Sequence, residues 1–392
     1  MKYGCSIKAW ADEGADRPLY LWLYYTFPVE TARNGKYHCF PGFFAHTVDK
    51  QMKLFHKLGY RGMFHCGYGQ DVEAYVTFKL MDDPGQKIEK LLDEYFSGLY
   101  GAAAKPMEEL YAAMEKVYTD PRNYPKERVS GAQLSWGCLG TEERMAQFER
   151  LLQQAKSLAK TDREKRNVEL FELGTWSYMT AGRQKFVDRQ KAPIPSAKAP
   201  RVPDASGVLN YVQWEKAAAL DERWYDRGGA EPSARKFEGR VAHDGKYLYL
   251  ELTDDCDTSK LVSSAMVFPY DDWEVFVAAQ RAVPYRQYAV GPSGLITALA
   301  HGEINFRMNV PIEDHGVKAM SDTSNPKKWV TRMAIPLQQA IPGGVNPGEK
   351  AYMNIIRVTG PALTGTGGLG IDTWVSYCTV HEADRLAEIL LE

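Results

Sequence analysis

The chain has 392 residues, of which 48 are basic and 50 acidic, so its formal net charge is −2. This balance excludes the basic footprint by which nucleic-acid-binding proteins are usually known, and we expect no nucleic-acid partner. No apolar run reaches the length of a membrane-spanning helix, so we expect no membrane partner either. The length predicts two or three domains.

The six cysteines are scattered along the chain. None lies in a C-x-x-C pair or in a Cys/His cluster with zinc spacing, which favours free thiols in a reducing compartment. The start of the chain, MKYGC, has no apolar signal core. The sequence as given therefore favours a cytoplasmic protein, whereas a chain truncated at its start could come from a secreted or periplasmic one.

The first elements of the chain predict a β-α-β unit. Residues 19–25 (LYLWLYY) form the continuous apolar run that is typical of a strand buried on both faces of a parallel sheet. Residues 46–58 follow with helical spacing, and residues 60–66 (YRGMFHC) predict a second buried strand. Residues 70–190 then carry amphipathic stripes that predict helices almost throughout.

A stretch rich in Pro, Ala and charge, residues 188–206, marks the strongest domain boundary. Beyond it the pattern changes to short alternating strands, which predict an antiparallel β-sandwich. The predicted strands cover residues 246–253, 273–277, 285–290, 295–300, 329–335, 352–358 and 385–391, and residues 302–320 are left open. The fold class is thus multidomain α+β. We predict an α/β part over residues 1–85, a helical region over 86–190, a linker over 191–206 and the sandwich over 207–392.

An ordered set of motifs runs through the predicted sandwich. In chain order the motifs are Trp214-Glu215-Lys216, His243-Asp244-Gly245-Lys246-Tyr247, Asp254-Asp255, Asp271-Asp272-Trp273-Glu274, Trp329, Ile335-Pro336-Leu337, Asn354 with Arg357, and Trp374. This set resembles the family 9 carbohydrate-binding modules and their relatives. The resemblance implies a sandwich that binds an oligosaccharide or polysaccharide between aromatic side chains, with polar groups bonded to the hydroxyls.

The resemblance also implies the residues of the sugar site. Glu274 falls on the position of a family sugar-contacting acid, and Arg357 completes the polar half of the site. Phe268 lies near one aromatic clamp position, and Tyr377 and His381 lie near the other. A family arginine is replaced by Ala289. The alternative is a sandwich that packs on its neighbours and binds nothing tightly.

The N-terminal part carries a second resemblance. Its motifs are Tyr20-Leu21-Trp22-Leu23-Tyr24-Tyr25-Thr26, Gly59-Tyr60-Arg61-Gly62-Met63-Phe64, Ala74-Tyr75-Val76, Lys79-Leu80-Met81, Asp83-Pro84, Tyr95-Phe96 and Leu99-Tyr100-Gly101-Ala102-Ala103. The set is similar to the end of an uncharacterised bacterial family related to α-glucuronidases. That resemblance implies the last two strands of a (β/α)₈ TIM barrel of glycoside hydrolase type, and a role in carbohydrate catabolism.

Glycoside hydrolysis normally needs two carboxylates flanking the scissile bond, and barrels place them at the C-terminal ends of strands. No such pair follows the two predicted strands, so the catalytic residues are unknown. Tyr24, Tyr25, His65 and Tyr68 could line a sugar subsite of the barrel, with buried packing as the alternative. Two strands cannot close a barrel, so we expect the helices, a missing N-terminal barrel portion or a partner chain to cover them.

No cofactor is required by these readings. The acidic residues Asp254, Asp255 and Asp257 could hold Ca²⁺, because hard cations prefer several oxygen ligands, although a solvated turn is the simpler interpretation. Two functions remain open: a glycoside hydrolase relative, which includes the C-terminal fragment of a longer enzyme, and a non-catalytic carbohydrate-binding protein.

Overall fold

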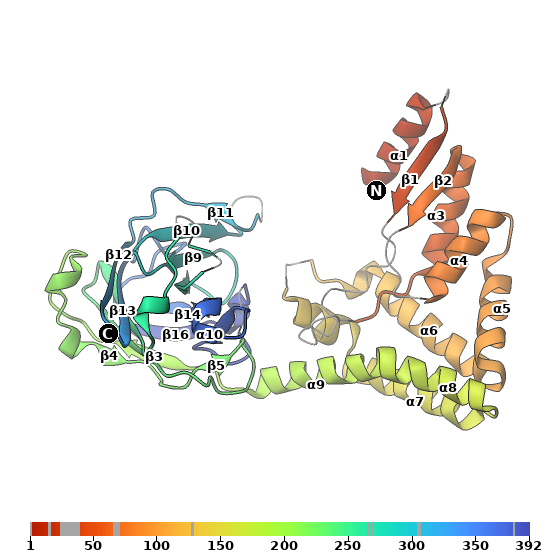
Figure 1. The fold of residues 1–392 in the computed structure, drawn as a ribbon. Coiled ribbons are helices and arrows are strands. Elements are labelled where there is room, and N and C mark those ends of the chain that lie inside the picture. The colour runs from red at the N-terminus through yellow and green to blue at the C-terminus, as the bar shows by residue number, and fades with distance from the viewer. Residues whose placement is uncertain are drawn as a thin grey trace. The chain divides into compact units, whose positions relative to one another are not determined.

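The computed structural model describes residues 2–14, 17–23, 40–65, 71–126, 129–264, 267–268, 270–303, 307–378 and 381–392. The chain divides into two compact units, residues 1–190 and residues 191–392 (Figure 1). Within the described parts, no helix is both long and apolar enough to cross a membrane.

The first unit contains the predicted parallel strand pair. Strands β1 (Leu19–Leu23) and β2 (Tyr60–His65) are hydrogen-bonded in parallel, with helix α3 (Ala45–Lys57) between them in the chain. Their sheet has two strands in the described part of the unit. The pair confirms the β-α-β pattern, but two strands do not establish a TIM barrel.

The two faces of this small sheet differ. The leucines of β1 are partly buried against the helical core, whereas Tyr20 and Trp22 are 68% and 64% exposed. Phe64 of β2, also 57% exposed, lies with its ring centroid 4.9 Å from that of Trp22. The helices of this unit therefore cover one face of the pair, while aromatic side chains remain exposed on the other.

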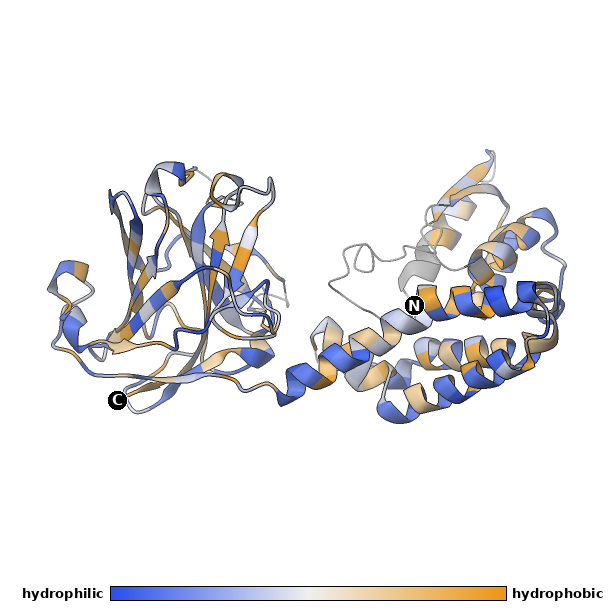
Figure 2. Cartoon of the chain, turned by 60° about the horizontal axis from the view of Figure 1, so that its bottom comes forward, coloured by the Kyte–Doolittle hydropathy of each residue, from blue (hydrophilic) through white to orange (hydrophobic). Residues whose placement is uncertain are grey.

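Helices make up the rest of the first unit. They are α1 (Lys2–Glu13), α4 (Asp71–Asp82), α5 (Ile88–Tyr100), α6 (Ala104–Thr119), α7 (Glu142–Leu158), α8 (Asp162–Phe171) and α9 (Ser177–Lys191), with π-helical segments at Gln133–Leu139 and Glu172–Trp176. Many of them show hydrophobic and hydrophilic residues on different sides (Figure 2). Their apolar stripes, such as Leu91 and Phe96 of α5 with Met107 and Leu110 of α6, meet in one core.

The second unit is a sandwich of two sheets. The larger sheet has the order β11-β10-β9-β8-β14-β15-β5, with β16 paired to β14 and β3 paired to β16; the smaller has the order β12-β13-β7-β6-β4. The larger sheet comprises β3 (Ser196–Ala199), β5 (Tyr225–Asp226), β8 (Asp272–Ala278), β9 (Tyr285–Val290), β10 (Ile296–His301), β11 (Val310–Pro311), β14 (Lys350–Thr359), β15 (Gly370–Thr373) and β16 (Ala387–Leu391). The smaller comprises β4 (Ala218–Ala219), β6 (Phe237–His243), β7 (Tyr247–Asp254), β12 (Lys318–Asn325) and β13 (Lys328–Pro336).

The sandwich core follows from strand alternation. Leu248, Leu250 and Leu252 of β7 point to one side of their strand, as Val275 and Val277 of β8 do, and all five are fully buried in the same cluster. The predicted sandwich is therefore present, with β4, β5, β6, β11, β12 and β15 among the strands that the sequence pattern did not reveal.

The predicted linker is part of this unit. Residues 196–199 form strand β3, which pairs in parallel with β16 at the end of the chain. A stretch rich in Pro and charge thus supplies an edge strand, because an edge strand needs hydrogen bonds along only one side. The boundary between the units lies at residue 190/191, where the predicted helical region ends and the predicted linker begins.

Candidate functional site

Strand β8 distributes its side chains between two environments. Trp273, Val275 and Val277 point into the core between the sheets. Asp272, Glu274 and Phe276 alternate with them and therefore lie on the other side of the larger sheet. This second side, called the outer face below, is itself partly covered by an apolar cluster: Phe276, Ala278, Tyr285, Ile356, Val358, Ala383 and Leu386.

A directional chain of hydrogen bonds crosses the outer face and ends on Glu274. The main-chain N–H of Asn309 donates to Nδ1 of His301 over 3.2 Å, so the proton of this imidazole lies on Nε2. His301 Nε2 then donates to Gln287 Oε1 over 3.1 Å, and Gln287 Nε2 donates to Glu274 Oε2 over 3.0 Å. Each bond fixes the orientation of the next group, so Glu274 is held in one position. Its other oxygen, Oε1, accepts no hydrogen bond from the described residues and is left for a ligand.

Aromatic rings lie beside this chain of hydrogen bonds. The Tyr285 ring stacks on His301 with a centroid distance of 4.7 Å and an interplanar angle of 15°. Tyr285 Oη and His381 Nδ1 are hydrogen-bonded at 2.8 Å, and the His381 ring lies 4.8 Å from His301 and 6.4 Å from Phe276. The outer face therefore places two aromatic rings and two histidines next to a fixed carboxyl group, the combination that a sugar ring with its hydroxyls requires.

Burial sets the charge state of the acids on this face. Asp272 is fully buried, and within the described residues neither of its carboxyl oxygens has a hydrogen-bond partner. Burial raises the pKa of Asp272 well above its usual range, and the neighbouring Glu274 raises it further. Burial also raises the pKa of Glu274, while the hydrogen bond from Gln287 works in the opposite direction.

The loop that carries His381 is fastened to the sheet. Asn354 of β14 accepts hydrogen bonds from the N–H groups of Ile355 and Val375 through Oδ1, at 2.9 and 3.2 Å. Arg385, which is buried, donates to the carbonyl of Ser376 over 3.1 Å. His381 itself has a φ of 72° and is exposed, so its ring reaches the outer face from a tight turn.

Arg357 does not lie on the outer face. Its guanidinium is fully buried between the sheets, where it bonds to Asp254 Oδ2 at 2.8 Å and to Asp271 Oδ1 at 3.0 Å. It lies over the rings of Trp329 and Trp273, at 4.7 and 5.9 Å from their centroids. The prediction that Arg357 contacts sugar is therefore corrected: its donors are engaged inside the core, and its neighbours Ile356 and Val358 take the outer face.

Phe268 and Tyr377, the other two predicted clamp residues, are not part of the hydrogen-bond network of Glu274 that is described above. Phe268 is partly buried just before β8. Tyr377 is partly buried with a φ of 52°, and its main-chain N–H donates to Gly229 over 3.1 Å. Of the predicted sugar-contacting residues, the structure thus joins Glu274 and His381 through one network, and it leaves Phe268 and Tyr377 as separate candidates.

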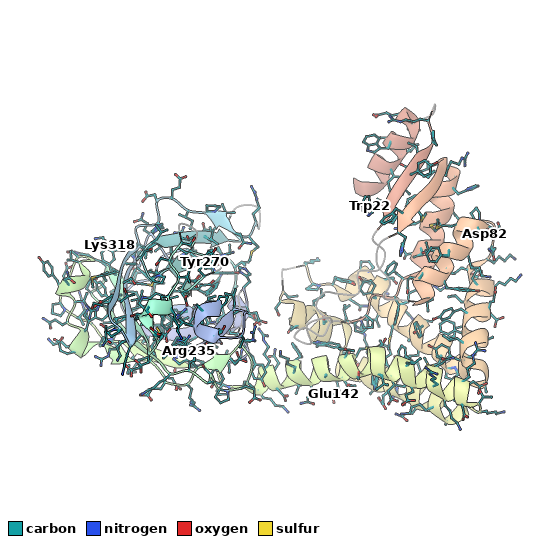
Figure 3. All side chains as sticks on the ribbon, in the orientation of Figure 1. Trp22, Asp82, Glu142, Arg235, Tyr270 and Lys318 are labelled. Carbon is teal, nitrogen blue, oxygen red and sulfur yellow. The ribbon has the colours of Figure 1, made fainter. Side chains whose placement is uncertain are left out.

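The acidic residues proposed for Ca²⁺ are engaged in different places. Asp254 is fully buried and forms ion pairs with Arg357 and with Arg235, which Figure 3 labels. Asp255 lies 3.6 Å from the Lys328 ammonium group, and Asp257 accepts hydrogen bonds from Ser259. Within the described part of the chain, no three His, Cys, Asp or Glu side chains are grouped to hold a metal ion.

The proposed barrel subsite is described only at His65. Tyr24, Tyr25 and Tyr68 lie outside the described residues. The His65 side chain is buried at the end of β2, with its ring 6.3 Å from that of Phe78, and burial lowers its pKa. A neutral, buried imidazole here agrees with the packing interpretation of this residue.

Gln287, His301 and Tyr285 are the residues of the outer face that sequence reasoning missed. Tyr285 and Gln287 lie two residues apart on one predicted strand, so their side chains share a face of the sheet. This spacing could have indicated them once Glu274 had been assigned to a face. His301 ends β10, and its place opposite Tyr285 follows only from the register between β10 and β9.

The first part of the chain matches a known family model. Residues 1–112 match the family model of DUF4838, a domain of unknown function. No curated protein matches the chain. The C-terminal region resembles solved carbohydrate-binding proteins in fold.

The solved structures that are similar to the chain include the following three. A Bacteroides uniformis ATCC 8492 protein that is proposed to bind carbohydrate is 14% identical, with a TM-score of 0.38, and the match covers 51% of this chain and all of that one. A family 9 carbohydrate-binding module from Caldicellulosiruptor kristjanssonii, in complex with cellotriose, is 13% identical, with a TM-score of 0.34 and coverage of 50% and 93%. The family 9 module from that organism in complex with glucose is 14% identical, with a TM-score of 0.33 and coverage of 51% and 95%. These likenesses concern the fold and show neither a TIM barrel nor glycoside hydrolase activity.

Proposed function

We propose that the second unit binds carbohydrate on the outer face of its larger sheet. The observation that carries the proposal is the chain of hydrogen bonds from Asn309 through His301 and Gln287 to Glu274. It holds a carboxyl group in one orientation with Oε1 left for a ligand, beside the rings of Tyr285 and His381. A site of this kind accepts hydrogen bonds from hydroxyl groups while the rings pack against the C–H face of a sugar.

The polar part of the site is better defined than the aromatic part. Glu274 supplies the acceptor, and His381 is the exposed ring that a ligand meets first. Phe268 and Tyr377, both partly buried, are proposed as further contacts at the rim. An oligosaccharide or polysaccharide end is the proposed ligand, because the site presents one acid and a small group of rings instead of a long aromatic platform.

Isothermal titration calorimetry of the whole chain tests the proposal, with glucose and cellotriose as the probes. Glu274→Gln keeps the size of the side chain and its bond from Gln287, but it replaces the carboxylate oxygen Oε1, which accepts hydrogen bonds from hydroxyl groups, with an amide NH₂ group. Hydrogen bonds to charged groups contribute about 1.5–3 kcal/mol, so the affinity should fall by roughly ten- to a hundredfold.

Glu238→Gln is the matched control, because Glu238 lies exposed on β6 of the other sheet, 3.8 Å from the Lys236 ammonium group. Its variant should bind like the wild type. Absence of binding to either sugar, or equal binding by the wild type and Glu274→Gln, would contradict the proposal.

A glycoside-hydrolase-related role in carbohydrate catabolism is the second candidate. It is favoured by the parallel pair β1–β2 with α3 between its strands, which is the repeating unit of an α/β barrel. We propose that further strands, supplied by a longer chain or by a partner chain, would complete such a barrel next to the exposed side chains of Tyr20 and Trp22. Release of reducing ends from uronic-acid-bearing oligosaccharides by this chain would support hydrolysis, and binding without release would favour the purely binding role.

A further inference from the structure

Two carboxyl groups lie next to each other on the outer face. Asp272 and Glu274 are two residues apart on β8, so their side chains leave the strand on the same side, roughly 7 Å apart along it. Both are buried, with 0% and 5% of their surface exposed. The carbohydrate site proposed above uses only Glu274, and Asp272 remains unexplained by it.

Among the described residues, none forms a hydrogen bond or an ion pair with the Asp272 carboxyl group. Val358 lies opposite Asp272 on β14, and Ile356 lies opposite Glu274. A buried, unpaired carboxylate costs several kcal/mol, and two such charges side by side cost more, so such a pair retains a proton at neutral pH.

The charged and titratable groups around the pair do not change this conclusion. They are Asp271 before β8, Arg357 on β14, Asp372 on β15, Tyr285 on β9, His301 on β10 and His381 in the following loop. Arg357 is turned away into the core and is bonded to Asp254 and Asp271. His301 is hydrogen-bonded on both ring nitrogens, to the main-chain N–H of Asn309 and to Gln287 Oε1.

We propose that Asp272 and Glu274 act as an electrostatically coupled pair of acids that makes this site select uncharged, hydroxyl-rich sugars and reject sugars that carry a carboxylate. The inference rests on the proposed carbohydrate site and adds Asp272 as a specificity-determining residue. While one of the two carboxyl groups keeps its proton, the pair carries a single negative charge. As the pH rises and the pair ionises, its negative charge repels an anionic ligand more strongly. Burial, which raises the pKa of both groups, places this change above the usual range of carboxylic acids.

Glucose and glucuronic acid provide the test, because they share a ring and differ in the charge at C6. Calorimetry of the whole chain should show that glucose binds at least tenfold more tightly than glucuronate at pH 8. The ratio of the two affinities should fall at least threefold at pH 5, where glucuronic acid is still ionised but the protein pair is protonated. Asp272→Asn removes the like charge beside Glu274, so the ratio should depend less on pH between pH 5 and pH 8 than it does in the wild type.

Each outcome separates the possibilities. If glucose does not bind to the wild type, the proposed carbohydrate site fails and the selectivity question does not arise. If glucose binds but glucuronate binds equally well at pH 8, the charge selection proposed here is wrong while the sugar site stands. If Asp272→Asn keeps the full pH dependence, protonation of His301 or His381 causes it and Asp272 is not its origin. Glu238→Gln should reproduce the wild-type ratios throughout.

Discussion

Replacing Arg357 with methionine should destabilise the sandwich without removing a ligand contact. Methionine fills much of the volume and can still touch the Trp329 ring, but it leaves Asp254 and Asp271 without their shared cation. Asp254 keeps its ion pair with Arg235, and Asp271 keeps hydrogen bonds from the N–H groups at positions 262 and 360. The substitution therefore leaves two buried carboxylates, Asp254 and Asp271, with less positive charge beside them.

The expected size of the effect follows from burial. Removing one partner of a buried ion pair costs about 3–5 kcal/mol. For a unit of this size, 1 kcal/mol lowers the melting temperature by about 2–4 °C, which gives roughly 6–20 °C for Arg357→Met. Arg332→Met is the matched control, because Arg332 also pairs with an acid, Glu251 at 2.7 Å, but does so with 31% and 15% of the two side chains exposed. Partly exposed pairs contribute about 0–1 kcal/mol.

Thermal unfolding followed by near-ultraviolet circular dichroism suits this comparison, because Trp273 and Trp329 lie under the guanidinium. Calorimetry at a temperature where both variants are folded then shows whether sugar binding persists. Equal melting temperatures for the two variants would refute the structural role of Arg357. A tenfold loss of glucose affinity in folded Arg357→Met would instead return this residue to the binding site.

Three further outcomes are expected. Burial raises the pKa of Asp272 in the folded state, so the contribution of this group to stability is full below its unfolded pKa and is lost as the pH rises. The Asp272→Asn variant should therefore be more stable than the wild type in urea unfolding at pH 8 and should show no gain at pH 4. Gln287→Leu frees Glu274 to move and should weaken glucose binding at least tenfold in calorimetry, with unchanged far-ultraviolet circular dichroism as the control. The hydrogen bond between His46 and Glu115 raises the pKa of His46, so the stability from this pair is full below the unfolded pKa of His46 and declines above it. Glu115→Gln should remove that decline from unfolding curves measured between pH 5.5 and 8. The decline should be less than about 1 kcal/mol, because the His46 side chain is half exposed.

The sequence was sufficient for the elements whose pattern is local. The alternation in β7 and β8 and the apolar runs of β1 and β2 predicted strands where the structure has them. The pattern failed where only pairing makes a strand. Residues 196–199 (SAKA) have no large apolar side chain and border a proline-rich stretch, yet β16 offers them a free edge.

The candidate site shows the same limit. An arginine between Ile356 and Val358 on a strand is usually read as pointing to solvent, with its apolar neighbours inside. Here both faces of β14 are buried near Arg357, so polarity does not indicate which face is the core. Arg357 turns inward because Asp254 and Asp271 lie there, on other strands and loops that are far away in sequence. Glu274 could be assigned from a motif, whereas Gln287 and His301 required the order and register of the strands.

The pairing of β3 with β16 also has a mechanical consequence. The second unit begins and ends with these two strands, which run parallel from Ser196 opposite Glu388 to Ala199 opposite Leu391. A force that pulls the start of the unit away from the end of the chain acts along both strands in opposite directions. It therefore loads all the hydrogen bonds of the pair together in shear, instead of opening them one after another.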